Sequence, residues 1–158
     1  MVGQRRQRVR DPIHGLITFA SEGDEARRDQ AAWALLNAPE FQRLRRIRQL
    51  GLSEFTFPGA THSRFATSLG VFHTARVLVG ILKNLLPDAD FDSDRAGVAV
   101  LAALVHDLGH GPFSHAFETV QQARGSHKDH EEWTAEIILN PAGKIRPILE
   151  KYQAGIAA

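Results

Sequence analysis

Apolar residues recur at three- and four-residue intervals over most of the chain, a spacing typical of amphipathic helices. The longest such stretch begins at Arg64 and is stopped by Pro87, because proline cannot continue a helix. A second stretch, Ala96–Val105, has no polar side chain, which predicts a helix enclosed on nearly all sides. The pattern predicts helices over residues 24–38, 39–50, 64–86 and 94–105, and near 129–139 and 143–153.

Two short runs near the N-terminus, QRVR and LITF, flank the sequence DPIHG, whose proline and glycine are turn residues. They predict a small β-hairpin ahead of the helices. There is no internal repeat, and 158 residues with 43% hydrophobic content suffice for one packed core. The expected fold is therefore all-α with a short N-terminal β-hairpin, in a single domain over residues 1–158.

Composition narrows the kinds of site that the chain can hold. With 19 basic and 18 acidic side chains the formal net charge is +1, so no overall charge favours DNA or an anionic membrane. The chain has no cysteine, so a metal site would use histidine and carboxylate. We expect no membrane span, because no window approaches the roughly 18 to 20 apolar residues that a span needs. These features predict a cytoplasmic protein.

A cluster of ionisable residues directly follows the apolar stretch, in the sequence LVHDLGHGPFSHAFE. It comprises His106, Asp107, His110, His115 and Glu118. The glycines within it predict that the backbone soon bends away from the helix. A buried carboxylate without a partner is costly, and one metal ion bound by imidazole nitrogen and carboxylate oxygen would offset that cost. The alternative is that these histidines cap or pack the helix end.

The cluster and the motifs ahead of it resemble a known family. RDPIHGLI, PEFQRLRRIRQLG, FPGATHSRF, SLGVFH and HDLGHGPFSH resemble, in order, motifs of the HD-domain phosphohydrolases of the deoxynucleoside triphosphate triphosphohydrolase branch, over roughly residues 8–131. The resemblance implies a helical core that binds a divalent ion, such as Mn, Fe, Mg, Zn or Ni, through a histidine, a His-Asp pair and a later aspartate. It also implies attack of water on the α-phosphate, which releases nucleoside and triphosphate.

The same resemblance assigns roles to residues of this chain. His106 and Asp107 match the His-Asp pair and are expected to bind the metal. The side chains expected to contact phosphate or to move protons are His110, His115, Glu118 and His130. Arg64 is expected to clamp phosphate, a role suited to its planar fork of donors. Gln49 and Leu50 match a pair that contacts the nucleoside sugar.

The chain departs from the family pattern at several positions. Thr67 stands where the family has its first metal-ligating histidine, and a hydroxyl is a much weaker ligand than imidazole. The family's last metal ligand is an aspartate in a helix well downstream of the position of His130. No such helix is recognised in this sequence, so we expect the domain to lack the family's C-terminal helices. Glu118 replaces an aspartate, which keeps the charge but lengthens the side chain. A regulatory nucleotide site is not expected, because Asn37 and Arg10 replace its usual aspartate and asparagine.

Three functions remain open from the sequence. The first is metal-dependent hydrolysis of a nucleotide, in particular a deoxynucleoside triphosphate. The second is a degenerate or truncated module that binds nucleotide or a partner without catalysis, because expected ligands are missing. The third is nucleic-acid binding through Arg43, Arg45, Arg46 and Arg48. A solvated basic face on an amphipathic helix is the other interpretation of these arginines, and the small net charge favours it.

Missing helices would also leave apolar surface exposed. The expected location is the long helix, at Leu69, Phe72 and Val79. A homo-oligomer or a complementing chain is therefore an expected partner, in addition to the nucleotide.

Overall fold

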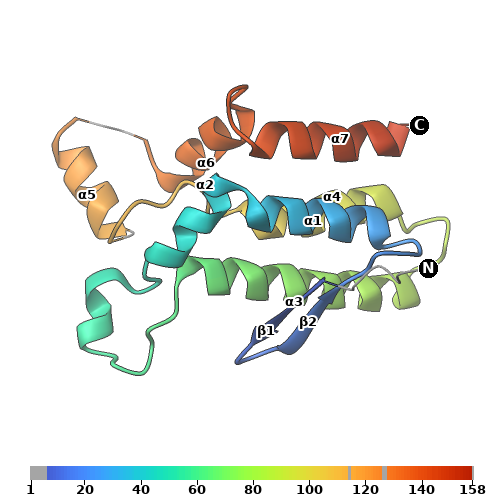
Figure 1. Cartoon of the computed structure of the whole chain (residues 1–158), viewed down its shortest axis with the longest axis horizontal. Helices are drawn as coiled ribbons and strands as arrows, with labels where there is room; N and C mark the ends of the chain where they lie inside the picture. The colour runs from blue at the N-terminus through green and yellow to red at the C-terminus, as the bar shows by residue number, and fades with distance from the viewer. Residues whose placement is uncertain (1–6, 114, 126–127, 158) are drawn as a thin grey trace.

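The computed structural model describes residues 7–113, 115–125 and 128–157, and over these residues the chain forms a helical bundle with one two-stranded sheet (Figure 1). The strands are β1 (Gln7–Asp11) and β2 (Gly15–Phe19), the α-helices are α1 (Ala26–Asn37), α2 (Pro39–Gln42), α3 (Arg64–Leu85), α4 (Ser93–Val105), α5 (His115–Ala123), α6 (His130–Leu139) and α7 (Ile145–Ala157), and the 3₁₀ helices are η1 (Arg43–Arg46) and η2 (Gly51–Phe55). The expected all-α class with an N-terminal hairpin is confirmed.

The hairpin is held by its turn and by the core beneath it. Its strands pair antiparallel, with Asp11 opposite Gly15. The Asp11 carboxylate accepts a hydrogen bond from the backbone N–H of His14 at 2.8 Å, and Gly15 has the left-handed φ of 73° that closes the turn. Ile17 and Phe19 are buried, so one face of β2 attaches the hairpin to the helices.

The long helices run roughly parallel to the long axis of the molecule, whereas α5 stands apart at one end (Figure 1). Helix α4 contacts both α1 and α3, and α7 packs on α1. Leu35 of α1, Phe72 of α3, Leu104 of α4 and Ile145 of α7 are fully buried between these helices. The core therefore includes the inner face of α4, whose C-terminal end leads into the ionisable cluster.

The helix predicted over residues 39–50 is wrong beyond its beginning. Helix α2 has only four residues, η1 follows it, and Ile47 is extended with φ −104° and ψ 114°. Backbone pairing with the segment ahead of α3 replaces the helix. The N–H of Gln49 donates to the His62 carbonyl at 3.1 Å, and the N–H of Arg64 donates to the Ile47 carbonyl at 2.9 Å. This pairing overrides local helix propensity and brings the segment beside the start of α3.

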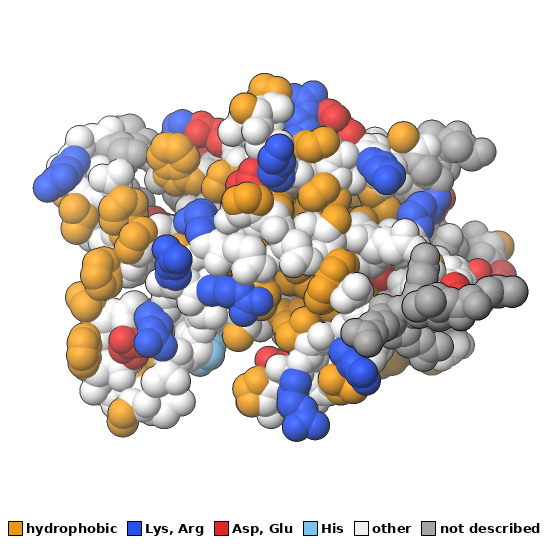
Figure 2. Space-filling view, viewed as in Figure 1, with side chains coloured by type: hydrophobic (Ala, Val, Ile, Leu, Met, Phe, Trp, Pro, Cys, Tyr) orange, Lys and Arg blue, Asp and Glu red, His pale blue; other side chains and the backbone are white. Residues whose placement is uncertain are grey.

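Apolar surface is exposed on α3 and α4, but not where the sequence placed it. Leu69 and Phe72 are buried because they face the core, and Val79 is partly buried against it. The exposed apolar side chains of α3 are Val71, Val77, Leu78, Ile81, Leu82 and Leu85. Helix α4 is also not enclosed on all sides, since Val98 is 51% exposed. Figure 2 shows apolar side chains lying between charged ones on the face of the molecule that is turned toward the viewer.

By length and composition, helix α3 is long and apolar enough to cross a membrane. This differs from the expectation that no segment of the chain would be long and apolar enough. Only 28% of its most apolar window is buried. Its inner face packs on α4, and a helix that carries part of a soluble core meets the same criteria.

Phe72→Ala is expected to lower the free energy of unfolding by about 3–5 kcal/mol. Phe72 is fully buried and stacks on Phe19 of β2 with the ring centroids 5.6 Å apart, so truncation leaves a cavity where the hairpin meets α3. Urea unfolding followed by circular dichroism measures the change. Val77→Ala on the exposed side of α3 is the control and should cost less than about 1 kcal/mol. An equally small effect of Phe72→Ala would contradict this packing.

Candidate metal and catalytic site

The apolar helix α4 ends in a bend that carries the ionisable cluster. After Val105, residues 106–110, hereafter the His–Asp loop, form consecutive tight turns. The N–H of Leu108 donates to the Val105 carbonyl at 3.1 Å, and the N–H of His110 donates to the Asp107 carbonyl at 3.2 Å. The side chains of Asp107 and His110 are buried as a result, and the predicted break after the helix is confirmed.

The Asp107 carboxylate lies at the centre of the cluster. Its Oδ2 accepts a hydrogen bond from Arg64 Nη1 at 2.6 Å, and its Oδ1 lies 3.1 Å from His106 Nε2 and 3.5 Å from His110 Nε2. Burial alone would raise the pKa of Asp107, but the hydrogen bonds from His106 and Arg64 outweigh it and hold the pKa well below its ordinary value. The carboxylate is therefore ionised at neutral pH.

The orientation of His106 favours a positive charge beside this carboxylate. His106 Nδ1 lies 2.9 Å from the Ala103 carbonyl oxygen, which can only accept, so Nδ1 carries the proton. In neutral imidazole, Nε2 is then an acceptor that faces the Asp107 carboxylate, itself an acceptor. A second proton or a cation resolves this conflict, and the hydrogen bond to Asp107 accordingly raises the pKa of His106.

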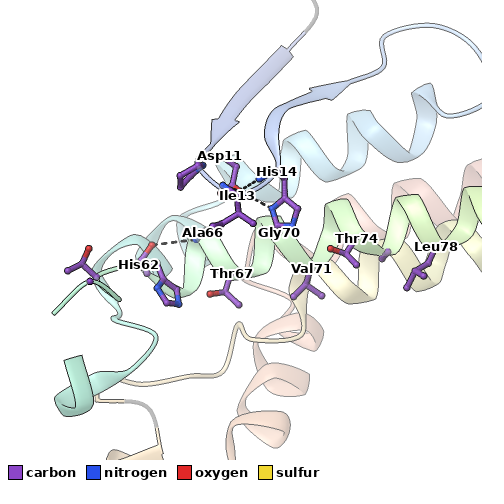
Figure 3. Close-up of a pocket in the computed structure, with 15 residues that line it drawn as sticks. Asp11, Ile13, His14, His62, Ala66, Thr67, Gly70, Val71, Thr74 and Leu78 are labelled. Atoms are coloured by element: carbon purple, nitrogen blue, oxygen red, sulfur yellow. Dashed lines mark hydrogen bonds and ion pairs between the residues drawn. The ribbon is translucent and has the colours of Figure 1, made fainter. Parts of the chain in front are cut away.

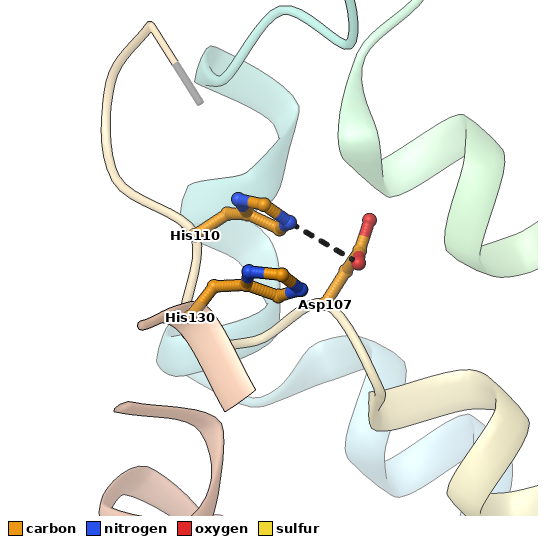
Figure 4. A group of neighbouring side chains, drawn as sticks. All are labelled: Asp107, His110 and His130. Carbon is orange, nitrogen blue, oxygen red and sulfur yellow. Dashed lines mark ion pairs between the residues drawn. The ribbon is translucent and has the colours of Figure 1, made fainter. Parts of the chain in front are cut away.

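Two more imidazoles lie beside Asp107. The rings of His110 and His130 stack with centroids 3.9 Å apart and an angle of 14° between their planes (Figure 4). One possible ligand atom from each of Asp107, His110 and His130 lies within 4.8 Å of the others. Burial and then the charge of Arg64 lower the pKa of His110 to about 4, so this imidazole is neutral at pH 7.

Glu118, in the first turn of α5, joins the histidines from the other side. Its Oε1 accepts a hydrogen bond from His130 Nδ1 at 2.9 Å, and its Oε2 accepts one from His115 Nδ1 at 3.0 Å. His110 Nδ1 lies 3.7 Å from the same Oε1. Burial would raise the pKa of Glu118, but the hydrogen bonds and charges of His115 and His130 lower it. The glutamate thus fixes the protons of the His115 and His130 imidazoles at Nδ1, which leaves the Nε2 of each with a lone pair.

These donors fit a divalent metal ion. An ionised carboxylate stands among imidazole nitrogens, which is the ligand set expected of a site without cysteine. If two ligand atoms each lie about 2.1 Å from an ion, and their bonds to it meet at a right angle, the two atoms lie about 3.0 Å apart. The distance of 3.1 Å between His106 Nε2 and Asp107 Oδ1 matches this separation.

The residues predicted to bind substrate are only partly brought to the cluster. Arg64 joins it directly through Asp107. Gln49 and Leu50 are half-buried in the segment that pairs with the start of α3. Within the part of the chain that the structure describes, Gln49 Oε1 is a buried acceptor without a hydrogen-bond partner, an arrangement suited to a ligand hydroxyl. The sugar contact of Gln49 and Leu50 stays a prediction.

Thr67, which the sequence predicts to replace a metal-ligating histidine, lines a cavity of about 970 Å³ beneath the hairpin turn (Figure 3). His62 lines the same cavity, whose remaining walls are mainly apolar. Among the described residues, none of the His–Asp loop borders it. Because Thr67 follows Arg64 by one helical turn, the cavity begins beside the cluster rather than within it. Its volume is in the range of small-ligand sites.

The arginines of η1 are largely engaged within the protein. The guanidinium of Arg43 donates to the carbonyl of His110 at 2.8 Å and to that of Leu108. Arg45 lies over the ring of Phe65, 3.6 Å from its centroid. These contacts account for both arginines without a nucleic acid. Sequence reasoning missed the role of Arg43 because its partners are backbone carbonyls 65 and 67 residues away.

A helical core whose central helix ends on a His-Asp pair, beside an arginine and further histidines, defines the class of HD-type phosphohydrolases. Residues 64–154 match the HD domain family, and the chain belongs to that family of metal-dependent phosphohydrolases.

The chain is also similar to named proteins along most of its length. It is 44% identical over 146 residues to the uncharacterized protein YwfO of Bacillus subtilis, covering 92% of this chain and 30% of that protein. It is 40% identical over 147 residues to the deoxynucleoside triphosphate triphosphohydrolase SAMHD1 of Gallus gallus, and 35% identical over 150 residues to that of Homo sapiens. These matches cover 90% and 91% of this chain and 22% of each SAMHD1. The chain therefore spans less than a third of the length of these relatives.

Proposed function

We propose that this protein hydrolyses nucleotides in a metal-dependent reaction and that its substrate is a deoxynucleoside triphosphate. The observation that carries the proposal is the ionised, buried carboxylate of Asp107, which contacts Arg64, His106 and His110. The names of the Gallus gallus and Homo sapiens relatives support the choice of substrate.

His106 and Asp107 would hold the ion, and the imidazoles of His110 and His130 lie close enough to Asp107 to complete its coordination. When bound, a divalent cation would lower the pKa of a water ligand and neutralise charge on phosphoryl oxygens. His110 suits this set because a ligand imidazole must be neutral. Arg64 would bind a phosphoryl oxygen, and its ion pair with Asp107 fixes the guanidinium before substrate arrives.

His115 and Glu118 would manage the proton of the leaving group. In the proposed reaction, water oxygen bonds to the α-phosphorus and gives up a proton to the solvent, the bond from phosphorus to the nucleoside 5′ oxygen breaks, and that oxygen takes up a proton. The side chain of His115 is mostly exposed, and its Nδ1–H donates a hydrogen bond to Glu118. Its Nε2 is therefore the atom from which a proton would be donated to the leaving group. Glu118 stabilises the imidazolium form that this donation requires.

A second candidate function is nucleotide binding without turnover. It is favoured by Thr67, because a hydroxyl holds a metal ion less firmly than the imidazole usual at this position. In a binding module the cluster around Asp107 and Arg64 would still present a positive donor to phosphate. Such a module would bind nucleotide in the presence of a chelator.

Product analysis tests the proposed reaction. The purified protein is incubated with each deoxynucleoside triphosphate and Mn²⁺, and the products are separated by ion-exchange chromatography. We expect nucleoside and tripolyphosphate in equal amounts, and neither product in EDTA. Absence of cleavage with Mn, Fe, Mg, Zn and Ni, together with nucleotide binding that persists in EDTA, would contradict hydrolysis and favour the binding module.

A further inference from the structure

The backbone of the His–Asp loop is held by two side chains from outside the loop. The polar backbone groups concerned are the carbonyls of His106, Leu108 and His110 and the N–H of Gly109. Their partners are Thr134 of α6 and Arg43 of η1. The loop carries the buried charge of Asp107. Among the described residues, its own backbone hydrogen bonds include the one from the His110 N–H to the Asp107 carbonyl, so side chains from outside the loop supply much of its support.

Thr134 holds the loop through both functions of its hydroxyl. Thr134 Oγ1 accepts a hydrogen bond from the Gly109 N–H at 2.7 Å and donates one to the His106 carbonyl at 3.1 Å. It lies four residues after His130, so both side chains project from the same face of α6. Thr134 is only 7% exposed, which shields both bonds from water.

The approach of the loop to α6 is close enough to require glycine. A Cβ atom on Gly109 would lie 2.0 Å from the His130 carbonyl oxygen and 2.4 Å from the Thr134 backbone nitrogen. The two elements therefore meet backbone to backbone, and Thr134 sets the register in which His130 faces His110.

Arg43 holds the C-terminal part of the same loop. Its two terminal nitrogens donate to the carbonyls of Leu108 and His110, which point in a direction that a planar fork of donors can satisfy together. The side chain also lines, with His110 and Glu118, a cavity of about 110 Å³ behind the imidazoles. Arg43 thus fixes the backbone from which the His110 ring projects.

We propose that Thr134 and Arg43 are positioning residues that clamp the His–Asp loop and so place His106, Asp107 and His110 for metal binding. Their effect on the metal rests on the proposed function, whereas their effect on the imidazoles does not. Neither side chain touches the carboxylate or an imidazole in the bonds described, so each acts through the loop backbone.

Thr134→Val and Thr134→Ser separate the hydroxyl from the shape of the side chain. Valine keeps the shape and removes both hydrogen bonds, and serine keeps the hydroxyl. We expect Thr134→Val to weaken Mn²⁺ binding by at least about tenfold in electron paramagnetic resonance titrations, and Thr134→Ser to stay within about threefold of the native protein. In metal-free protein, the imidazole nitrogen resonances of His106 and His110 should shift in Thr134→Val but not in Thr134→Ser. Thr74→Val, at an exposed position of α3, is the control.

Arg43→Lys keeps the charge but loses the fork, and should reproduce the effect of Thr134→Val on the same two measurements. Arg46→Lys, exposed on the same 3₁₀ helix, is its control. If Thr134→Val and Arg43→Lys both leave the imidazole resonances and the Mn²⁺ affinity as in the native protein, the clamp is wrong. If the native protein binds Mn²⁺ but cleaves no nucleotide, the proposed function fails while these two measurements still decide the clamp. If it binds no Mn²⁺, the imidazole resonances alone decide it.

Discussion

Replacing Asp107 with asparagine is expected to abolish metal binding and to slow nucleotide cleavage at least about a thousandfold. The Asp107 carboxylate lies 3.1 Å from His106 Nε2 and 3.5 Å from His110 Nε2, and asparagine offers the ion a neutral oxygen instead. A metal ion contributes several kcal/mol of transition-state stabilisation, and each 1.36 kcal/mol is a factor of ten in rate. Metal content by elemental analysis and turnover at saturating Mn²⁺ measure the two effects.

The same substitution should also destabilise the fold, because the buried guanidinium of Arg64 loses its carboxylate. Breaking a buried pair on one side costs about 3 kcal/mol. The double variant Arg64→Met with Asp107→Asn removes both charges and should recover most of that loss without recovering metal. Asp90→Asn, in the exposed α3–α4 connection, controls for the loss of one charge. Native metal affinity in Asp107→Asn would remove this carboxylate from the site.

Glu118→Gln is expected to reduce turnover by about 10²–10⁴ and metal affinity by a smaller factor, about tenfold. Glu118 accepts the Nδ1 protons of both His115 and His130 with its two carboxylate oxygens. An amide has one oxygen and one NH₂ group, so one of these imidazoles would meet a donor and would have to change tautomer. The loss should therefore fall on proton transfer.

Turnover at saturating Mn²⁺ and Mn²⁺ affinity, measured on the same preparation, test the role of Glu118. Glu131→Gln, exposed in the first turn of α6, is the matched control and should change neither quantity by more than about threefold. Equal losses of metal affinity and turnover in Glu118→Gln would show that the glutamate acts only as support for the metal ligands.

Elements with strong local signals could be predicted from the sequence. The hairpin is defined by a proline–glycine turn between two short runs, and α3 by its apolar periodicity and Pro87. The segment after α2 could not be predicted, because Ile47 gives up helical geometry for backbone bonds to residues ahead of α3. Helix α5 was not predicted either, since its first residue, His115, follows directly on a turn-rich sequence.

The candidate site likewise has features that the sequence predicts and features that depend on tertiary packing. The chemistry of His106 and Asp107 is visible in the sequence because the two residues adjoin the stretch Ala96–Val105, which has no polar side chain. That His110 and His130 stack beside Asp107 depends on how α6 packs against the His–Asp loop, which no local pattern encodes. The support from Arg43 goes to backbone carbonyls, so its side chain carries no signature of the contact.

Exposed apolar surface keeps open the prediction of a protein partner. A groove of about 620 Å³ runs between α4, α6 and α7 and is lined by Val98, Ala102, Ile138 and Leu149 among others. It lies on the face of α4 that the sequence led us to expect would be enclosed. A second copy or a complementing chain stays a prediction.

The most direct test of a metal centre at Asp107 is the metal content of protein purified without chelator and reconstituted with Mn²⁺. Elemental analysis measures it for the native protein and for the Asp107→Asn variant. We expect about one ion per native chain and none in the variant, since the variant lacks the charge beside which His106, His110 and His130 lie. A native protein that binds no ion after incubation with Mn, Fe and Zn, or a variant that retains it, would contradict a metal centre at Asp107.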